Sequence, residues 1–123
     1  MLRRLALAAV AALVLGAAES AQAQTNLDFE LVNKTGYGIS EVYVSPSAAD
    51  KWGETIISEV LENNEFVKIS FNPEATGIEK WDLMVTFVDD DSKVYWRGFT
   101  LSTINRITLK YNRETQETTS VTE

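Results

Sequence analysis

The feature of this chain that most constrains its fold is an alternation of apolar and polar residues with a period of two. Successive side chains of a β-strand point to opposite faces, so a segment with this alternation can bury one face and expose the other. The alternation predicts an all-β domain, a single antiparallel β-sandwich of about six to eight strands, with a small barrel as the alternative. The clearest segments are 28–31, 41–45, 66–71, 81–87, 93–97 and 107–111.

Residues typical of turns separate these segments. Asn33 to Gly38 contains two glycines and an asparagine, which tolerate positive φ angles, so we expect this stretch to reverse the chain. Residues 89–92 are three aspartates and a serine, and they are expected to form the loop of a hairpin. Asn72-Pro73 ends the strand before it, because proline cannot donate a hydrogen bond to a neighbouring strand.

The longest segment without alternation is 45–64. Ser47 is followed three residues later by Asp50, a spacing that resembles a helix N-cap with an acidic third position. We therefore expect a short helical turn over Ala48–Trp52 within this long loop. Residues 56–61 fit either a seventh strand or a short helix, and we favour the strand.

The N-terminus has the order of features of a secretory signal peptide, predicted over residues 1–23. Arg3 and Arg4 come first, the apolar run 5–18 follows, and Ala21-Gln22-Ala23 places small residues at a cleavage site after Ala23. The apolar run is shorter than the roughly 20 residues that a helix needs to cross a bilayer. We therefore expect a periplasmic or secreted protein whose mature chain contains no membrane span.

Cleavage after Ala23 leaves a chain of suitable length for one domain. We expect the β-sandwich over residues 24–111 and a polar C-terminal tail over 112–123, with a frayed end. Removing Arg3, Arg4 and Glu19 with the signal peptide changes the formal charge from −7 to −8. Such an acidic domain repels nucleic acid and anionic lipid headgroups, so we expect neither as a partner.

Histidine and cysteine are both absent from the sequence. Their absence excludes Ser-His-Asp and Cys-His nucleophile systems, histidine metal ligands, zinc–thiolate sites and thiol redox pairs. Glycine-rich phosphate loops and a Ser-x-x-Lys arrangement are missing as well. A pair of carboxylates could still serve a glycosidase, because that chemistry needs only two acids at a suitable separation. We expect no enzymatic activity, with a carboxylate-based hydrolase as the remaining enzyme alternative.

Asp89, Asp90 and Asp91 are the candidate metal-ligating residues. Hard cations such as Ca²⁺ take several oxygen ligands from flexible loops, and three consecutive carboxylates with loop carbonyls could supply them. Consecutive side chains in a hairpin diverge, so the alternative is a solvated acidic turn that discourages aggregation at the edge. A divalent cation is the one cofactor that the sequence suggests.

Trp52 and its neighbour Asp50 are candidate contacts for a partner or a ligand. They belong to the long segment 45–64, where a tryptophan can be an interface hot spot. The alternative is that Trp52 plugs the end of the sandwich. Trp81 and Trp96 lie in alternating segments and are expected to belong to the core.

Several runs of the sequence resemble a group of small exported proteins of Gram-negative bacteria, over about Phe29 to Arg113. The runs are Phe29–Tyr37, Ile39–Ser47, Asp50–Gly53 and Trp81–Leu83. Those chains are uncharacterised single-domain β proteins, and some carry the automatic label argininosuccinate lyase. Argininosuccinate lyases are large helical tetramers with catalytic serine and histidine, whereas this chain is short, β-patterned and without histidine. The resemblance therefore implies an exported β domain, and we transfer no catalytic residue.

The sequence as a whole favours a non-enzymatic protein of the cell envelope that acts as an interaction or structural module. Its partner is expected to be an envelope protein that docks on segment 45–64 or on the acidic face. The alternative is a small-ligand or cation-binding module that uses Asp89–Asp91. We regard the lyase label of similar chains as wrong for this one.

Overall fold

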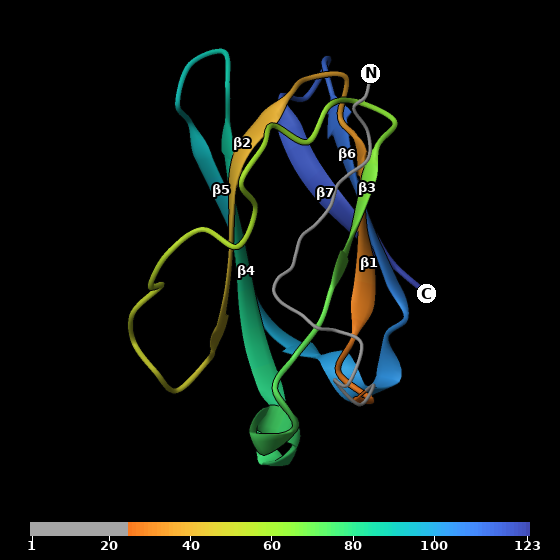
Figure 1. The fold of residues 1–123 in the computed structure, drawn as a ribbon. Helices are drawn as coiled ribbons and strands as arrows, with labels where there is room; N and C mark the ends of the chain where they lie inside the picture. The colour runs from red at the N-terminus through yellow and green to blue at the C-terminus, as the bar shows by residue number, and fades with distance from the viewer. Residues whose placement is uncertain (1–24) are drawn as a thin grey trace.

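A computed structural model describes residues 25–123, in which seven strands form two sheets (Figure 1). The signal peptide expected over 1–23, with cleavage after Ala23, lies outside the described residues. No helix within 25–123 is long and apolar enough to cross a membrane. The strands are β1 (Phe29–Lys34), β2 (Ile39–Pro46), β3 (Phe66–Ile69), β4 (Lys80–Phe87), β5 (Lys93–Thr100), β6 (Arg106–Asn112) and β7 (Glu117–Thr122), with short 3₁₀ helices η2 (Pro73–Gly77) and η3 (Leu101–Thr103).

The all-β prediction is confirmed, and each of the six alternating segments contains a strand. One sheet has the order β3-β1-β6-β7 and the other the order β2-β4-β5. Neighbouring strands are antiparallel except β1 and β6, which run parallel from Glu30 opposite Arg106 to Lys34 opposite Lys110. A purely antiparallel arrangement was therefore the wrong expectation for this pair. The long connection between β1 and β6 allows parallel pairing, which a short turn does not.

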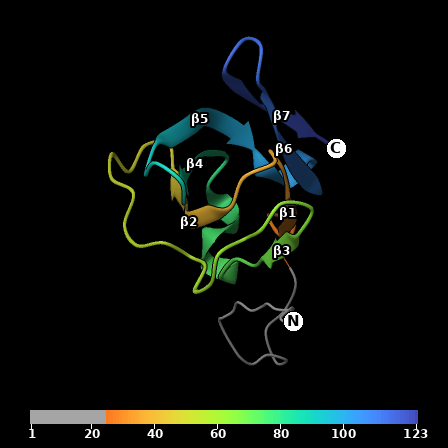
Figure 2. The same ribbon diagram turned by 90° about the horizontal axis from the view of Figure 1, so that it is seen from above.

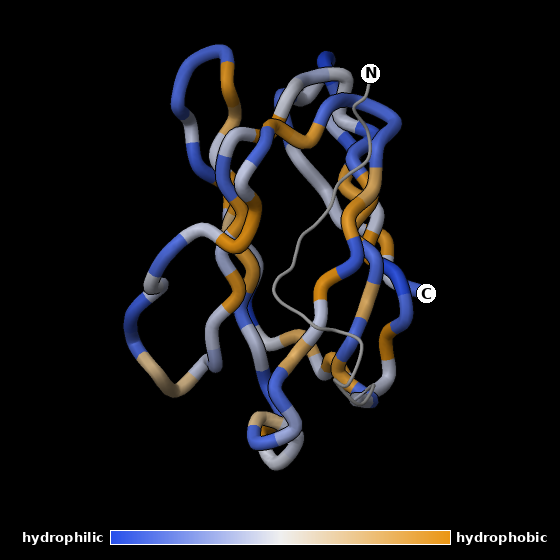
Figure 3. Tube along the Cα trace, in the orientation of Figure 1, coloured by the Kyte–Doolittle hydropathy of each residue, from blue (hydrophilic) through white to orange (hydrophobic). Residues whose placement is uncertain are grey.

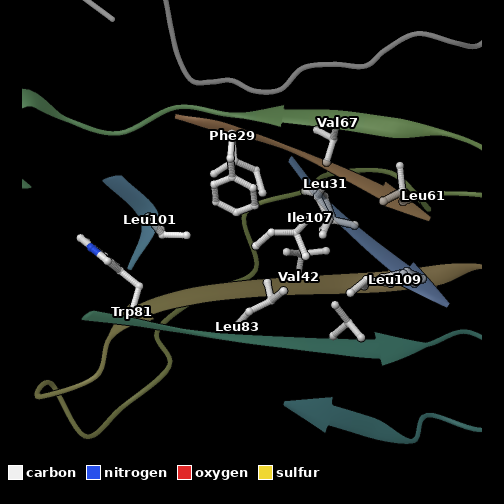
Figure 4. Packing of buried hydrophobic residues seen from close by; sticks show 14 of the residues in the cluster. Phe29, Leu31, Val42, Leu61, Val67, Trp81, Leu83, Leu101, Ile107 and Leu109 are labelled. Carbon is white, nitrogen blue, oxygen red and sulfur yellow. The ribbon is translucent and has the colours of Figure 1, made fainter. Parts of the chain in front are cut away.

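The core lies between the two sheets, which face each other when the molecule is seen from above (Figure 2). Leu31 of β1 and Leu109 of β6 point from one sheet toward Val42 of β2 and Leu83 of β4 in the other (Figure 4). All four side chains are buried, so burial of these inner faces provides the main hydrophobic stabilisation. The expectation for the tryptophans is met, since Trp81 is buried and Trp96 packs against the core.

The C-terminal residues differ from the frayed tail that we expected. Residues 117–122 form β7, which pairs with β6 in an unbroken register from Asn112 opposite Glu117 to Ile107 opposite Thr122. Alternation could not reveal this strand, because it contains threonine and serine where core strands have apolar residues. Threonine is β-branched and therefore suits a strand. The folded domain extends through this strand and does not end at residue 111.

The expected helical turn over Ala48–Trp52 is absent, and a tight turn takes its place. β2 continues through Pro46, whose carbonyl accepts a hydrogen bond from the Ala49 N–H at 2.9 Å. Ser47 does not cap a helix, because its hydroxyl donates to the carboxylate of Asp82 at 2.6 Å. Asp50 then has a φ of 62°, outside the right-handed helical region.

Residues 56–61 follow the edge of β2 without forming a strand. The Ile56 N–H donates to the Val42 carbonyl at 2.8 Å, and Leu61 forms one isolated bridge with Ile39. Between these points the segment is irregular, so the preference for a seventh strand here was wrong. The segment still covers part of an edge that would otherwise leave its peptide groups unpaired.

Asn33, at the end of β1, connects this segment to the rest of the fold. Its side chain is completely buried, and Nδ2 donates to the carbonyls of Tyr37 at 2.7 Å and Leu61 at 2.8 Å. Its Oδ1 accepts from the Thr35 N–H at 3.0 Å and from the Thr35 hydroxyl at 2.7 Å. One buried amide therefore satisfies groups in the turn after β1 and in the segment along β2.

Replacement of Asn33 with alanine should lower the free energy of unfolding by about 3 kcal/mol, because it leaves several buried polar groups without a partner. Urea unfolding of the Asn33→Ala variant measures this loss. Asn63→Ala is the matched control, since Asn63 is exposed and accepts one bond from the Gly36 N–H. The control should lose about 1 kcal/mol or less. Equal losses in the two variants would contradict the structural role of the buried amide.

Candidate functional site

The candidate site is the outer face of the three-stranded sheet, the face turned away from the core. Its side chains come from alternate positions of β2, β4 and β5, and the strand register arranges them in rows across the sheet. The middle row is aromatic at both ends, and the rows on either side of it contain charged groups. The rows that define the outer face are Glu41–Thr86–Lys93, Tyr43–Met84–Tyr95 and Ser45–Asp82–Arg97.

The central strand of this sheet is buried on both of its faces. Asp82, Met84 and Thr86 belong to the polar side of the alternation, yet they are only 4%, 8% and 3% exposed. Longer side chains on the neighbouring strands flank them, including Tyr43 and Tyr95 of the middle row. The outer face is therefore a packed layer of side chains above the sheet.

Asp82 is the central residue of the row Ser45–Asp82–Arg97, which lies at one end of this layer. Its carboxylate accepts hydrogen bonds from the Ser47 hydroxyl at 2.6 Å and from Arg97 Nη1 at 2.9 Å. The Gly98 N–H donates to the same carboxylate at 3.0 Å. A buried carboxylate needs such donors to compensate for its lost hydration, and here they come from a loop and from β5.

The Gly98 donor is available because β5 contains a bulge at this point. The pairing of β4 with β5 shifts register between Trp81 and Leu83, opposite Arg97 and Gly98. Gly98 has a φ of 81°, a conformation that glycine adopts readily because it has no Cβ atom. The bulge turns a peptide N–H of β5 toward Asp82, as bulges commonly redirect groups at functional sites.

Trp52, one of the candidate contact residues, lies against Tyr95 of the outer face. The two ring centroids are 6.5 Å apart, and the guanidinium carbon of Arg97 lies 5.1 Å from the Tyr95 ring centroid. The interpretation of Trp52 as a plug at the end of the sandwich therefore does not describe its position. Trp52, Tyr95 and Arg97 form a group that we call the aromatic–arginine cluster.

A small hollow lies beside this cluster and includes both candidate contact residues. Its volume is about 80 Å³, whereas pockets that enclose small-molecule ligands typically measure about 300–1,000 Å³. The lining of the hollow combines cationic, anionic, hydroxyl and aromatic groups. Its lining includes Ser45, Asp50, Lys51, Trp52, Asp82 and Arg97.

The row at the opposite end of the outer face contains an interacting acid–phenol pair. Hydrogen bonds from the hydroxyls of Tyr43 and Thr86, together with the charge of Lys93, hold the pKa of Glu41 below its usual value. The same contact with the carboxylate raises the pKa of Tyr43. Lys93 Nζ lies 3.5 Å from Glu41 Oε1 and donates to the Thr86 hydroxyl at 2.9 Å. This row is therefore an ordered hydrogen-bonding group at the surface.

The three aspartates of the β4–β5 loop do not converge. Asp89, Asp90 and Asp91 are all exposed at the hydrophilic tip of the hairpin (Figure 3). Asp90 Oδ1 accepts from the Ser92 N–H at 3.0 Å, and hydrogen bonds with Ser92 lower the pKa of Asp90. Among residues 25–123, no three acidic side chains gather as a metal site requires. The loop joins β4 and β5 as a hairpin, as the sequence predicts, and the Asp90 side chain stabilises its turn.

Sequence reasoning identified Trp52 and Asp50 but missed Asp82, Tyr95 and Arg97. All three occupy positions that alternate with apolar residues in segments 81–87 and 93–97, and this alternation was the available signal. Their convergence depends on the register of β4 with β5 and on the return of segment 47–52 to the sheet.

Removal of the Asp82 carboxylate should destabilise the fold more than removal of its cationic partner. We expect Asp82→Ala to cost about 3 kcal/mol, because three donors lose their acceptor and a buried volume empties. Arg97→Ala should cost about 1 kcal/mol, because the Arg97 side chain is 64% exposed and the carboxylate keeps two donors. Chemical denaturation of both variants measures the difference, and a larger loss for Arg97→Ala would contradict this assignment.

The Glu41 carboxyl should titrate with a pKa below the usual value of a glutamate side chain, which NMR of its side-chain carbon can measure. Since the folded-state pKa is lowered, the stability that Glu41 contributes is present above the unfolded-state pKa and is lost as the pH falls through the folded-state value. Tyr43→Phe removes the phenol hydroxyl, whose hydrogen bond is the largest cause of the lowered Glu41 pKa, so this variant should raise the Glu41 pKa. Tyr95→Phe is the control, and its Glu41 pKa should match that of the unaltered protein.

Comparison with known proteins gives no family assignment. No protein-family model matches the chain, and neither the curated proteins nor the solved structures contain a significant match. The functional conclusion therefore depends on the outer face and on the chemistry of the sequence.

Proposed function

We propose that the chain is an exported β-sandwich module of the bacterial cell envelope that binds a protein partner with the outer face of its three-stranded sheet. The observation that carries this proposal is the aromatic–arginine cluster. Tyr95 is 56% exposed, and the Arg97 side chain is 64% exposed. Tryptophan, tyrosine and arginine are the residue types that most often dominate binding energy at protein interfaces.

The cluster is also ordered before any partner arrives. Asp82 holds one end of the Arg97 guanidinium, and the Tyr95 ring lies beneath the same group. Binding then immobilises fewer side-chain torsions, which lowers its entropic cost. Arg97 has N–H groups beyond the one that contacts Asp82, and they are available to an incoming carboxylate or carbonyl.

The dimensions of the hollow favour a protein partner over a free small molecule. A volume of about 80 Å³ accepts part of a side chain and cannot enclose a ligand of ordinary size. A partner that inserts an apolar group beside Trp52 and pairs a carboxylate with Arg97 would use both chemistries of the site. Residues 50–52, which line the hollow, belong to segment 45–64, where the sequence predicts a partner contact.

Export is the second part of the proposal. The charged, apolar and small-residue regions of 1–23 support it, as does the resemblance to small exported proteins. The envelope is the compartment in which the partner is expected.

Site-specific photo-crosslinking in intact cells of the source organism tests the proposed interface. A photoreactive residue in place of Lys51, which is exposed and lines the hollow beside Trp52, should give one discrete adduct with an envelope protein, and Trp52→Ala should reduce it at least several-fold while the fold remains intact. The matched control has the same photoreactive residue at Lys68, which is exposed on the other sheet.

Two outcomes would overturn the proposal. Equal adducts at positions 51 and 68, or no adduct at 51, would remove the assigned interface. An intact mass that includes residues 1–23 in the chain recovered from cells would remove export by a cleaved signal peptide.

A further inference from the structure

The four strand edges of the two sheets differ in how they are protected. The edge of β2 is covered by segment 55–61, through bonds such as that from the Val42 N–H to the Thr55 hydroxyl at 2.9 Å. β5 carries Lys93, Arg97 and the Gly98 bulge. β3 has four residues, one of them Lys68. Short length, basic side chains and bulges are common devices that prevent strands from pairing with other molecules.

β7 has none of these devices. It is an outer strand of the four-stranded sheet (Figure 2), contains no lysine, arginine or proline, and pairs with β6 without a register shift. The Val121 side chain lies on the face of the sheet that is turned away from the core, and it is 43% exposed. Strands of this kind accept another strand through their free main-chain groups.

The hydrogen-bonding pattern identifies which main-chain groups of β7 are free. The Glu123 N–H donates to the Arg106 carbonyl at 2.9 Å, and the Arg106 N–H donates to the Glu123 carbonyl at 3.1 Å. Antiparallel pairs alternate along a ladder, so 117, 119 and 121 also bond to β6. Thr118, Ser120 and Thr122 therefore direct their N–H and carbonyl groups away from β6.

We infer that β7 pairs antiparallel with β7 of a second copy of this chain, which joins two four-stranded sheets across a two-fold axis. The local charge permits this contact despite the acidity of the protein. Within 106–123, three basic side chains balance three acidic ones, whereas the whole chain has a net charge of −7. Long-range repulsion between two copies therefore originates elsewhere in the chain, and it weakens with distance from the edge.

The charge pattern also decides between the two registers that keep most of β7 paired. A two-fold axis through Thr119 places Thr118 opposite Ser120 of the second copy, so that their free main-chain groups form hydrogen bonds. The same axis places Glu117 opposite Val121 of the second copy. An axis through Ser120 would instead place Glu117 opposite Glu123, and like charges directly opposite are unfavourable. Both axes keep the buried faces of the two sheets on one side, so the acidic residues decide between them.

Disulfide trapping in this cysteine-free chain tests the pairing and its register together. In the inferred register, residue 119 faces its own counterpart as a pair without main-chain bonds, at a Cα separation of about 4.5 Å that suits a disulfide. Thr119→Cys should therefore give a covalent dimer on mild oxidation of the folded protein. Val121→Cys is the matched control on the same face of β7, since its counterpart lies about 13 Å away.

A proline variant distinguishes strand pairing from disulfide formation through random collisions. Ser120→Pro removes an outward N–H and leaves the ladder with β6 intact, so adding it to Thr119→Cys should abolish trapping with little change in the melting temperature. Light scattering of the cysteine-free protein should show a dimer at high concentration, and Ser120→Pro should convert it to a monomer. Similar trapping rates for the Thr119→Cys and Val121→Cys variants, or a monomer at every concentration, would overturn the inference.

Discussion

Burial of β4 on both faces is the constraint on which the rest of the structure depends. Its inner residues, Leu83 among them, contribute to the core, while its outer residues would be solvated in an ordinary two-layer domain. Because Asp82 is buried on the outer side, its charge requires donors from other segments. The Gly98 bulge and the return of Ser47 to the sheet supply them. The order of the outer face therefore follows from the position of one strand.

The segment between β2 and β3 is shaped by hydrogen bonding more than by its own sequence propensity. Residues 55–61 have to satisfy part of the β2 edge, and the side chain of Asn33 fixes their end through the Leu61 carbonyl. These two requirements are met by an irregular path with one bridge to Ile39. The buried amide thus links the turn after β1, the covered edge and the core in one network.

The sequence predicts what is local and misses what depends on distant pairing. Alternation identified six strands and assigned Asp82, Tyr95 and Arg97 to outward faces, because side-chain direction follows from position in a strand. It could not reveal the parallel pairing of β1 with β6, which depends on contacts across the whole chain. β7 escaped detection because an edge strand needs fewer apolar residues. The hollow could not be predicted because the residues that line it come from separate segments of the chain.

The outer face and the free edge of β7 belong to different sheets, so a partner and a second copy do not compete for one surface. The inferred pairing through β7 would leave the aromatic–arginine cluster of each copy accessible, because the cluster lies on the other sheet. A dimer would then present two such clusters in a fixed relation, and binding at the second becomes intramolecular once the first is occupied. A hollow of about 80 Å³ offers limited contact at each site. Avidity from paired sites would therefore strengthen a weak individual contact wherever the proposed partner offers more than one copy of the contacted surface.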